Sequence, residues 1–71
     1  MAKDPTDIAY QVREALANDP RLQHSTIDVT YEDGAILLTG TVDRLENMRL
    51  AEEIARQQDG VDQVINQIRT P

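Results

Sequence analysis

The two-residue step Asp33-Gly34 places the tightest constraint on how this chain can fold. In residues 27–32 before it, apolar and polar side chains alternate, which is typical of a strand with one buried face. Residues 35–42 after it form a second apolar run. Asp and Gly tolerate the positive φ angles of a type I′ turn, so the two runs are predicted to form a hairpin. The turn fixes a register that pairs Glu32 with Ala35, Tyr31 with Ile36, Val29 with Leu38 and Ile27 with Gly40.

Gly40 is unusual because this register puts it on the core face of its strand, where a side chain would normally pack. A missing side chain lets another backbone approach closely, or permits a bulge. We therefore expect a helix backbone to lie close to the sheet at Gly40, or the strand to bulge there. A role in ligand binding is the less favoured alternative, since glycine inside a strand usually marks a close backbone approach.

The N-terminal segment carries the signals of a helix followed by a loop. Asp4 is expected to be the N-cap, with Pro5 at the first helical position. Apolar residues then recur at helical spacing. The helix should end near Asn18, because the Asp-Pro step that follows disfavours the α conformation. Leu22 is expected to anchor the next loop on the core.

A second helix is predicted between the hairpin and the last strand. Asp43 and Glu46 have the spacing of a capping box, so the helix should begin there. Asp59-Gly60 should end it, with Gly60 as a left-handed cap. The inner stripe of this helix is predicted to contain the apolar residues Leu45, Met48, Ala51, Ile54 and Ala55.

The C-terminal residues 61–70 are expected to form the last strand, in which Val61, Val64 and Ile68 face the core. Asn66 occupies an inward position, so its amide must find partners, and its expected role is to tie down a loop or a helix end. A strand-helix-strand crossover is normally right-handed and returns parallel. The sequence therefore predicts an α/β (α+β) fold: a two-layer αββαβ sandwich, whose three-stranded mixed sheet has the second strand at its centre and both helices on one face.

Size and charge limit what such a chain can do. With 71 residues it has room for one thin core, so we expect a single domain over residues 1–71 with an ordered core at about residues 5–69. It has no cysteine, which excludes disulfides, thiol nucleophiles and thiolate metal sites. The net charge of −6, without a basic cluster, argues against nucleic acid and against simple attraction to anionic lipid.

The first ten residues, "MAKDPTDIAY", contain one Lys and no apolar stretch typical of an export signal. No apolar run in the sequence approaches the length needed to cross a bilayer. As written, the chain is expected to be cytoplasmic. A mature periplasmic domain with a new initiator Met would look the same.

Two stretches, "IAYQVREALANDP" and "IDVTYEDGAILLTGTVDRLENMRLAEEIARQQDGVDQVINQI", together resemble a BON domain. The resemblance covers nearly the whole chain and rests on the order and spacing of several short motifs. These motifs are the Asp19-Pro20 step, the strand end from Leu38 to Val42, the Ala- and Glu-rich segment from Ala51 to Ala55, Gly60-Val61, Val64 and Asn66. The family pattern implies structural roles for Gly34, Gly40, Gly60, Val61 and Asn66.

This resemblance implies a non-enzymatic binding module without a cofactor. Its implied partner is a phospholipid surface or another protein or domain, in envelope maintenance or osmotic stress. Some cytoplasmic proteins with this domain are linked to potassium sensing. The alternative is therefore a small cytoplasmic regulatory protein that senses a monovalent cation such as potassium.

The polar residues show no arrangement typical of catalysis or metal binding. His24, the one histidine, lies near Ser25 and Asp28, but closeness in a loop does not make a triad, which needs directed hydrogen bonds. We expect an exposed His24 and no catalytic or metal-ligating residue. Neither of two acidic pairs, Glu52-Glu53 and Asp59 with Asp62, reproduces the regular spacing of a calcium loop.

The sheet face that the helices leave uncovered is predicted to be the main interaction surface. Leu37 and Ile65 should be its only large apolar groups, adjacent on the second and third strands. Harmless exposure is the alternative, because scattered apolar residues are normal on protein surfaces. A docking patch there would serve a second copy, in a weak homo-oligomer, or a sister domain or a lipid interface. The predicted face comprises Thr30, Leu37, Thr39, Ile65, Gln67 and Arg69.

Overall fold

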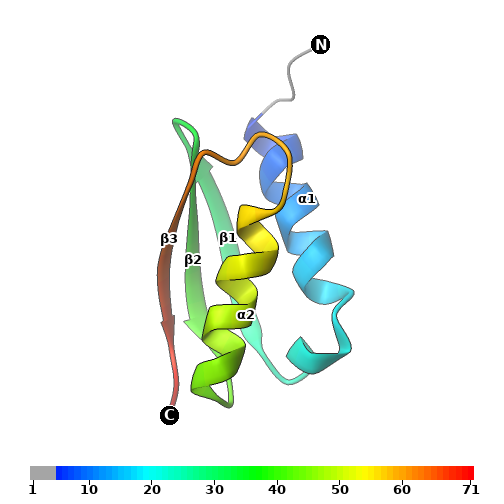
Figure 1. Cartoon of the computed structure of the whole chain (residues 1–71), viewed down its shortest axis with the longest axis vertical. Coiled ribbons are helices and arrows are strands. Elements are labelled where there is room, and N and C mark those ends of the chain that lie inside the picture. Colours follow the sequence, from blue (N-terminus) through cyan, green and yellow to red (C-terminus); the bar gives the residue numbers. More distant parts are fainter. Residues whose placement is uncertain (1–4) are drawn as a thin grey trace.

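The computed structural model describes residues 5–71 and shows two helices packed on one face of a three-stranded sheet (Figure 1). The predicted αββαβ sandwich is thereby confirmed. The expected N-cap Asp4 lies outside the described residues. The elements are α1 (Pro5–Ala17), a short 3-10 helix (Pro20–Leu22), β1 (Thr26–Glu32), β2 (Ala35–Thr41), α2 (Leu45–Arg56) and β3 (Gln63–Arg69).

The sheet has the order β1-β2-β3, so β2 is central as predicted. β1 runs antiparallel to β2, and β3 runs parallel to it. The four residue pairs predicted for the hairpin are all present. The two-residue turn therefore set the register correctly, because a shift by one residue would have turned the apolar side chains of β1 and β2 out of the core.

The hairpin turn also holds the start of β3. Asp33 and Gly34 have φ angles of 50° and 86°, the positive values that a type I′ turn requires. The carbonyl oxygen of Gly34 accepts hydrogen bonds from the backbone N–H groups of Asp62 (2.9 Å) and Gln63 (3.2 Å). A Cβ at Gly34 would stand 2.6 Å from Oδ2 of Asp62, a flexible side chain that could move away, so it is the positive φ of the turn that favours glycine here.

The core lies between the sheet and the two helices. From α1, Ile8, Val12 and Leu16 are buried, and Leu22 anchors the following loop as expected. The fully buried residues of α2 are the alanines Ala51 and Ala55, whose small side chains let this helix lie close to the sheet. The sheet contributes Val29, Ile36, Leu38 and Ile68, and Val42 just after β2 completes the core.

Gly40 accommodates a close backbone approach, but from a strand and not from a helix. A Cβ built on Gly40 would collide with the carbonyl oxygen of Thr26 on the neighbouring strand β1. The expectation of a helix at this position is therefore wrong. The β1–β2 register runs without interruption from Thr26 to Glu32, so the ladder has no bulge there either.

The predicted start of α2 is wrong by one residue, and its predicted end lies beyond the observed one. The chain bends at Asp43, and Arg44 is the N-cap, without a side-chain capping hydrogen bond. At the other end the helix stops at Arg56, with Gln57 as the C-cap. Gly60 has a φ of 88°, but it belongs to the turn beyond the cap, where a Cβ would stand 2.9 Å from Cδ1 of Ile8. Its positive φ thus lets the loop after α2 pass close to Ile8 of α1.

Leu45 is 57% exposed and does not belong to the inner stripe of α2. Successive helical residues are about 100° apart, which puts Leu45 in one row with Arg49, Glu52 and Arg56 on the flank of the helix. Val61, expected in the last strand, precedes β3, although it is half-buried and packs against the core.

Candidate functional site

The two helices cover one face of the sheet and leave the opposite face, called the outer face below, uncovered (Figure 1). Side chains alternate between the two faces of a strand. The burial patterns of the three strands follow this alternation. The alternation places all six residues of the predicted interaction face, Thr30, Leu37, Thr39, Ile65, Gln67 and Arg69, on this outer face.

Leu37 and Ile65 lie side by side at the centre of the outer face. They are direct partners in the parallel register between β2 and β3. Leu37 is half-buried and Ile65 is 40% exposed. On the other side Leu37 pairs with Thr30 of β1. The two apolar groups thus form one patch with a polar neighbour, and its use as an interaction surface stays a prediction.

A hollow of about 440 Å³ lies on this patch at the hairpin end. Ala35, Leu37 and Ile65 give it an apolar floor, and acidic side chains stand at its rim. The prediction from sequence missed the contribution of the hairpin. The hairpin register could have revealed it, because Glu32 and Ala35 flank the turn. The lining residues are Glu32, Asp33, Ala35, Leu37, Ile65 and Gln67.

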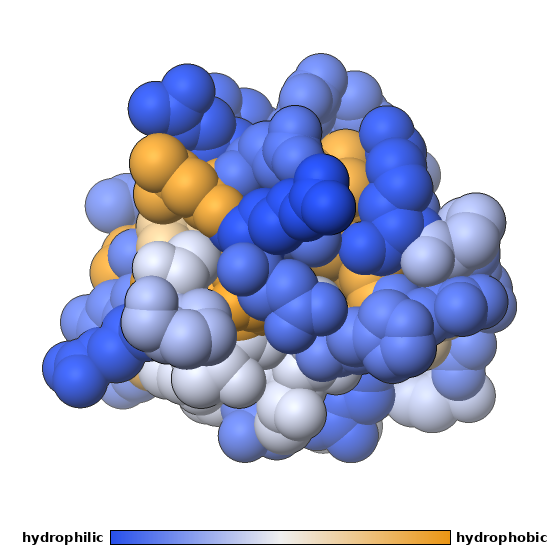
Figure 2. All heavy atoms as spheres, turned by 90° about the horizontal axis from the view of Figure 1, so that it is seen from below, coloured by the Kyte–Doolittle hydropathy of each residue, from blue (hydrophilic) through white to orange (hydrophobic). Residues whose placement is uncertain are grey.

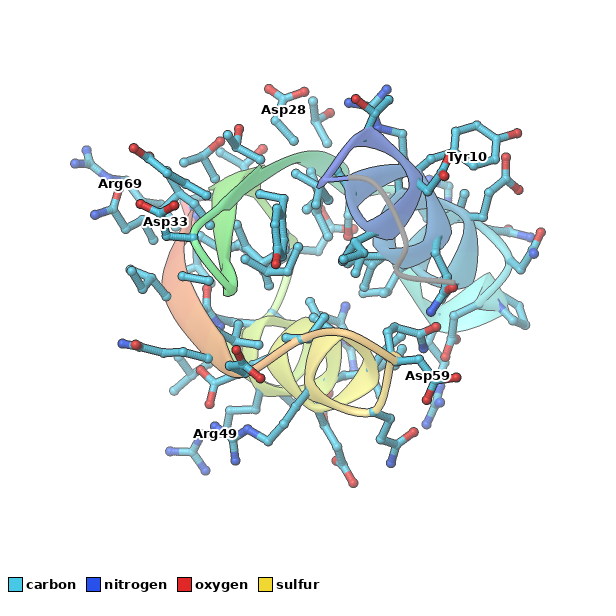
Figure 3. All side chains as sticks on the ribbon, turned by 90° about the horizontal axis from the view of Figure 1, so that it is seen from above. Tyr10, Asp28, Asp33, Arg49, Asp59 and Arg69 are labelled. Atoms are coloured by element: carbon cyan, nitrogen blue, oxygen red, sulfur yellow. The ribbon has the colours of Figure 1, made fainter. Side chains whose placement is uncertain are left out.

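A second hollow, of about 610 Å³, lies at the other end of the same strands. Its floor includes Gly40, and Arg69 supplies its charge. Viewed along the strands, Arg69 and Asp33 extend from the same side of the sheet, away from the helices (Figure 3). The outer face thus has the acids Glu32 and Asp33 near the hairpin, whereas Arg69 and the acid Asp28 of β1 lie toward the far end. The lining residues are Thr39, Gly40, Gln67, Ile68 and Arg69.

The end of the molecule that is seen from below is mostly polar. Apolar residues reach this surface only in small separate areas (Figure 2). Scattered apolar groups of this kind are ordinary on protein surfaces. The end surface therefore offers no broad apolar patch that could compete with the outer face as a binding site.

Asn66 has a structural position, on the helix side of β3. Its Nδ2 donates to the carbonyl oxygen of Met48 (3.0 Å) and to Oε1 of Glu52 (3.3 Å). Its Oδ1 accepts a hydrogen bond from the backbone N–H of Ile68 (3.0 Å). The amide is half-buried and ties α2 to β3, in line with the expectation that a polar group on the inward side of a strand must find partners. The attachment point is the middle of the helix and not its end.

The polar groups considered for catalysis are scattered. His24 is exposed in the loop before β1, and Asp28 lies within β1 on the outer face of the sheet. No hydrogen bond links His24, Ser25 and Asp28 within residues 5–71. In the same part of the chain, no group of three or more His, Asp or Glu side chains is placed to hold a metal ion.

The shifted pKa values lie away from both hollows. A side-chain hydrogen bond from Arg21 lowers the pKa of Asp19, and the backbone N–H of Arg21 contributes to the same effect. The guanidinium of Arg21 lies 2.7 Å from Asp19 Oδ2. On α1, a hydrogen bond and the negative charge of Glu14 raise the pKa of Tyr10. Both shifts arise from local pairs on the helix side of the molecule.

In the described part of the chain, no helix is both long enough and apolar enough to cross a bilayer. This finding agrees with the sequence, whose apolar positions are spread over short amphipathic elements.

Comparison with known proteins agrees with this fold. The model of the BON domain matches residues 4–71. An uncharacterized protein of Deinococcus radiodurans is 36% identical over 62 residues, which cover 87% of this chain and 24% of that protein. An uncharacterized protein of Anaplasma centrale is 43% identical over 54 residues, which cover 72% of this chain and 36% of that protein. BON domains are small modules of a binding type, associated with membranes or other proteins. By this match over nearly its whole length, the chain belongs to the BON domain family.

Proposed function

We propose that this BON domain binds another protein through the outer face of its sheet. The observation that carries the proposal is the adjacency of Leu37 and Ile65 in a hollow on a face that no helix covers. Apolar groups that lie together in a concave site with a polar rim are typical of the centre of a protein interface.

The charges around the hollow indicate the chemistry of the partner. Glu32 and Asp33 stand at its rim, and the whole chain carries a net charge of −6. Anionic lipid headgroups would be repelled from such a surface. An aliphatic side chain next to a lysine or arginine fits better, because the aliphatic group covers Leu37 and Ile65 while the cation meets the two acids.

The relatives suggest where such a partner is found. The matched segment makes up 24% of the Deinococcus protein and 36% of the Anaplasma protein, so in both the domain is joined to further chain. A neighbouring domain of the same protein is one source of the surface that fits the outer face. We place this contact in envelope maintenance or osmotic stress, the setting that the BON family implies.

Photocrosslinking from the outer face tests the proposal. A photoreactive phenylalanine analogue would replace Leu37 in cells that naturally produce the protein. The matched control is the same analogue at Tyr10, which is 61% exposed on α1, away from the outer face. We expect protein adducts from position 37 that are lost when Ile65→Asp is added, and no such adducts from position 10.

Vesicle sedimentation provides the second arm, with phosphatidylcholine alone and with added phosphatidylglycerol. We expect the purified protein to stay in the supernatant in both cases. Binding to vesicles that Leu37→Asp abolishes would show that the outer face contacts lipid, and the proposal of a protein partner would be wrong. Adducts from position 10 but not from position 37 would place the interaction surface elsewhere.

A further inference from the structure

The outer edge of β3 is the open edge of the sheet. β3 is the last strand in the order, and Figure 1 shows no element beyond it, whereas α1 lies beside β1 at the opposite edge. Residues 63–68 of β3 contain no charged residue and no proline. Natural proteins usually protect an open edge with such residues, because its unpaired backbone groups can pair with another strand.

The hydrogen bonds to β2 show which backbone groups of β3 remain available. The N–H of Gln63 donates to Gly34, and the carbonyl oxygen of Arg69 accepts from Val42. Because backbone groups alternate in direction along a strand, the odd-numbered residues of β3 bond to β2. The N–H and C=O groups of the even-numbered residues Val64, Asn66 and Ile68 therefore point to the open edge.

The side chain of Asn66 closes part of this edge. Its Oδ1 already accepts the outward N–H of Ile68 (3.0 Å), while its Nδ2 is held by Met48 and Glu52 of α2. One of the three outward donors is thus occupied. By occupying this donor, the Asn66 amide protects the edge against pairing with another strand, as a charged residue or a proline does in other proteins.

We propose that the outer edge of β3 pairs antiparallel with β3 of a second copy, about a two-fold axis at Asn66, and that the Asn66 amide keeps this pairing weak. Such an axis puts Asn66 opposite its own copy and Val64 opposite Ile68. The result is a continuous six-stranded sheet with all helices on one face. This surface is separate from the outer face, so the proposal does not depend on the proposed function.

The flank of α2 next to this edge is complementary to itself. Asn66 contacts Met48 and Glu52, so the axis lies level with the helical turn from residue 48 to residue 52. The axis brings this turn opposite the same turn of the second copy in reverse direction. Arg49 of each copy then faces Glu52 of the other, which creates two equivalent ion pairs.

In the part of the monomer that the structure describes, the flank of α2 next to β3 carries an unpaired cation and an exposed apolar side chain. Within the described residues, Arg49 has no ion-pair partner. Glu52 pairs with Arg56 through Oε2 (2.7 Å) and accepts a hydrogen bond from Asn66 Nδ2 at Oε1 (3.3 Å), so Arg49 of a second copy would meet a carboxylate that is already held in place. Leu45 lies in the same helical row and is 57% exposed, so a second copy would cover an apolar group as well. Arg69 and Asp62, near the ends of β3, add one charge of each sign. Charges of both signs are thus present along the edge, whereas the whole chain has a net charge of −6.

Charge reversal at two positions tests the proposal by sedimentation velocity over a range of protein concentrations. Arg49→Glu alone and Glu52→Arg alone should each abolish the dimer, because every facing pair then has like charges. A mixture of the two variants should form a heterodimer, since each acidic flank then meets a basic one. Leu37→Asp serves as the matched control and should leave the dimer intact.

Asn66→Val frees the N–H of Ile68 and should strengthen the dimer about tenfold or more. A destabilised variant could aggregate for other reasons, so the dimer of the Asn66→Val variant must also dissociate when Arg49→Glu is added. The proposal is overturned if the mixed charge variants stay monomeric. It is also overturned if the Asn66→Val variant still associates after Arg49→Glu is added. It is also overturned if Leu37→Asp abolishes the dimer, because the outer face would then be the contact.

Discussion

The carbonyl oxygen of Thr26 on β1 occupies the space where a Cβ of Gly40 on β2 would stand. Gly40 also has a φ of 121°, a backbone conformation that residues with a Cβ rarely adopt. Two independent features therefore require glycine, and both belong to the pairing of two strands and not to a ligand site.

Gly40→Ala should lower the free energy of unfolding by about 2 to 3 kcal/mol, because the new methyl group meets rigid backbone and the φ is strained. Urea denaturation followed by circular dichroism measures this loss. Gly60→Ala is the matched control: it has a similar positive φ, but its Cβ meets only the flexible end of Ile8, so the loss should be smaller. An unchanged midpoint and slope for Gly40→Ala would contradict the close approach.

Asn66→Ala should destabilise the fold by about 1 to 2 kcal/mol, because the Met48 carbonyl loses a donor and the N–H of Ile68 loses its acceptor. Gln67→Ala is the neighbouring control, since Gln67 is exposed on the outer face. Thermal unfolding of both variants gives the comparison. Equal stability of the two would mean that the Asn66 amide contributes no more than an exposed side chain.

Leu37→Asp should change the free energy of unfolding by less than about 1.5 kcal/mol, because Leu37 is half-buried on the outer face, outside the core. Thr30→Asp, at the position paired with Leu37, provides a control for an added charge on the same face. Equilibrium unfolding in urea measures both variants. Complete unfolding of Leu37→Asp would show that this side chain belongs to the core.

Acid should remove one local contribution to stability, that of Asp19 and Arg21. The pKa of Asp19 is lowered in the folded protein, so this pair stabilises the fold above the unfolded pKa and loses its effect as the pH falls through the folded pKa. The loss should therefore appear below about pH 4. An NMR titration of the Asp19 carboxyl, with thermal unfolding of the protein and of Asp19→Asn at each pH, follows it. A carboxyl that titrates above the usual aspartate pKa would contradict the assignment.

His24→Gln should leave the unfolding midpoint and the outer-face crosslinks unchanged within error, because His24 is exposed in a loop. The expected change in free energy of unfolding is below about 0.5 kcal/mol. Loss of crosslinking from position 37 without unfolding would give His24 a functional role that its position does not explain.

The sequence by itself determined the hairpin, the order of elements and the side of each strand residue. These depend on local rules: Asp33-Gly34 allows few turn geometries, and the period-2 pattern then assigns every side chain of β1 and β2 to a face. The adjacency of Leu37 and Ile65 also followed, because the crossover through α2 returns parallel beside the central strand.

The tertiary structure alone decided which neighbour needs Gly40, where α2 begins and ends, and what Asn66 holds. The spacing of residues shows that Gly40 lacks a side chain, but only the packed strands reveal that the Thr26 carbonyl requires it. Likewise, the sequence favours Asp43 as the N-cap of α2, but Arg44 takes that position without a side-chain capping hydrogen bond. Val42, just before it, is buried in the core and donates its N–H to the carbonyl oxygen of Arg69 on β3. These features depend on distances between elements far apart in the chain, which local residue preferences do not contain.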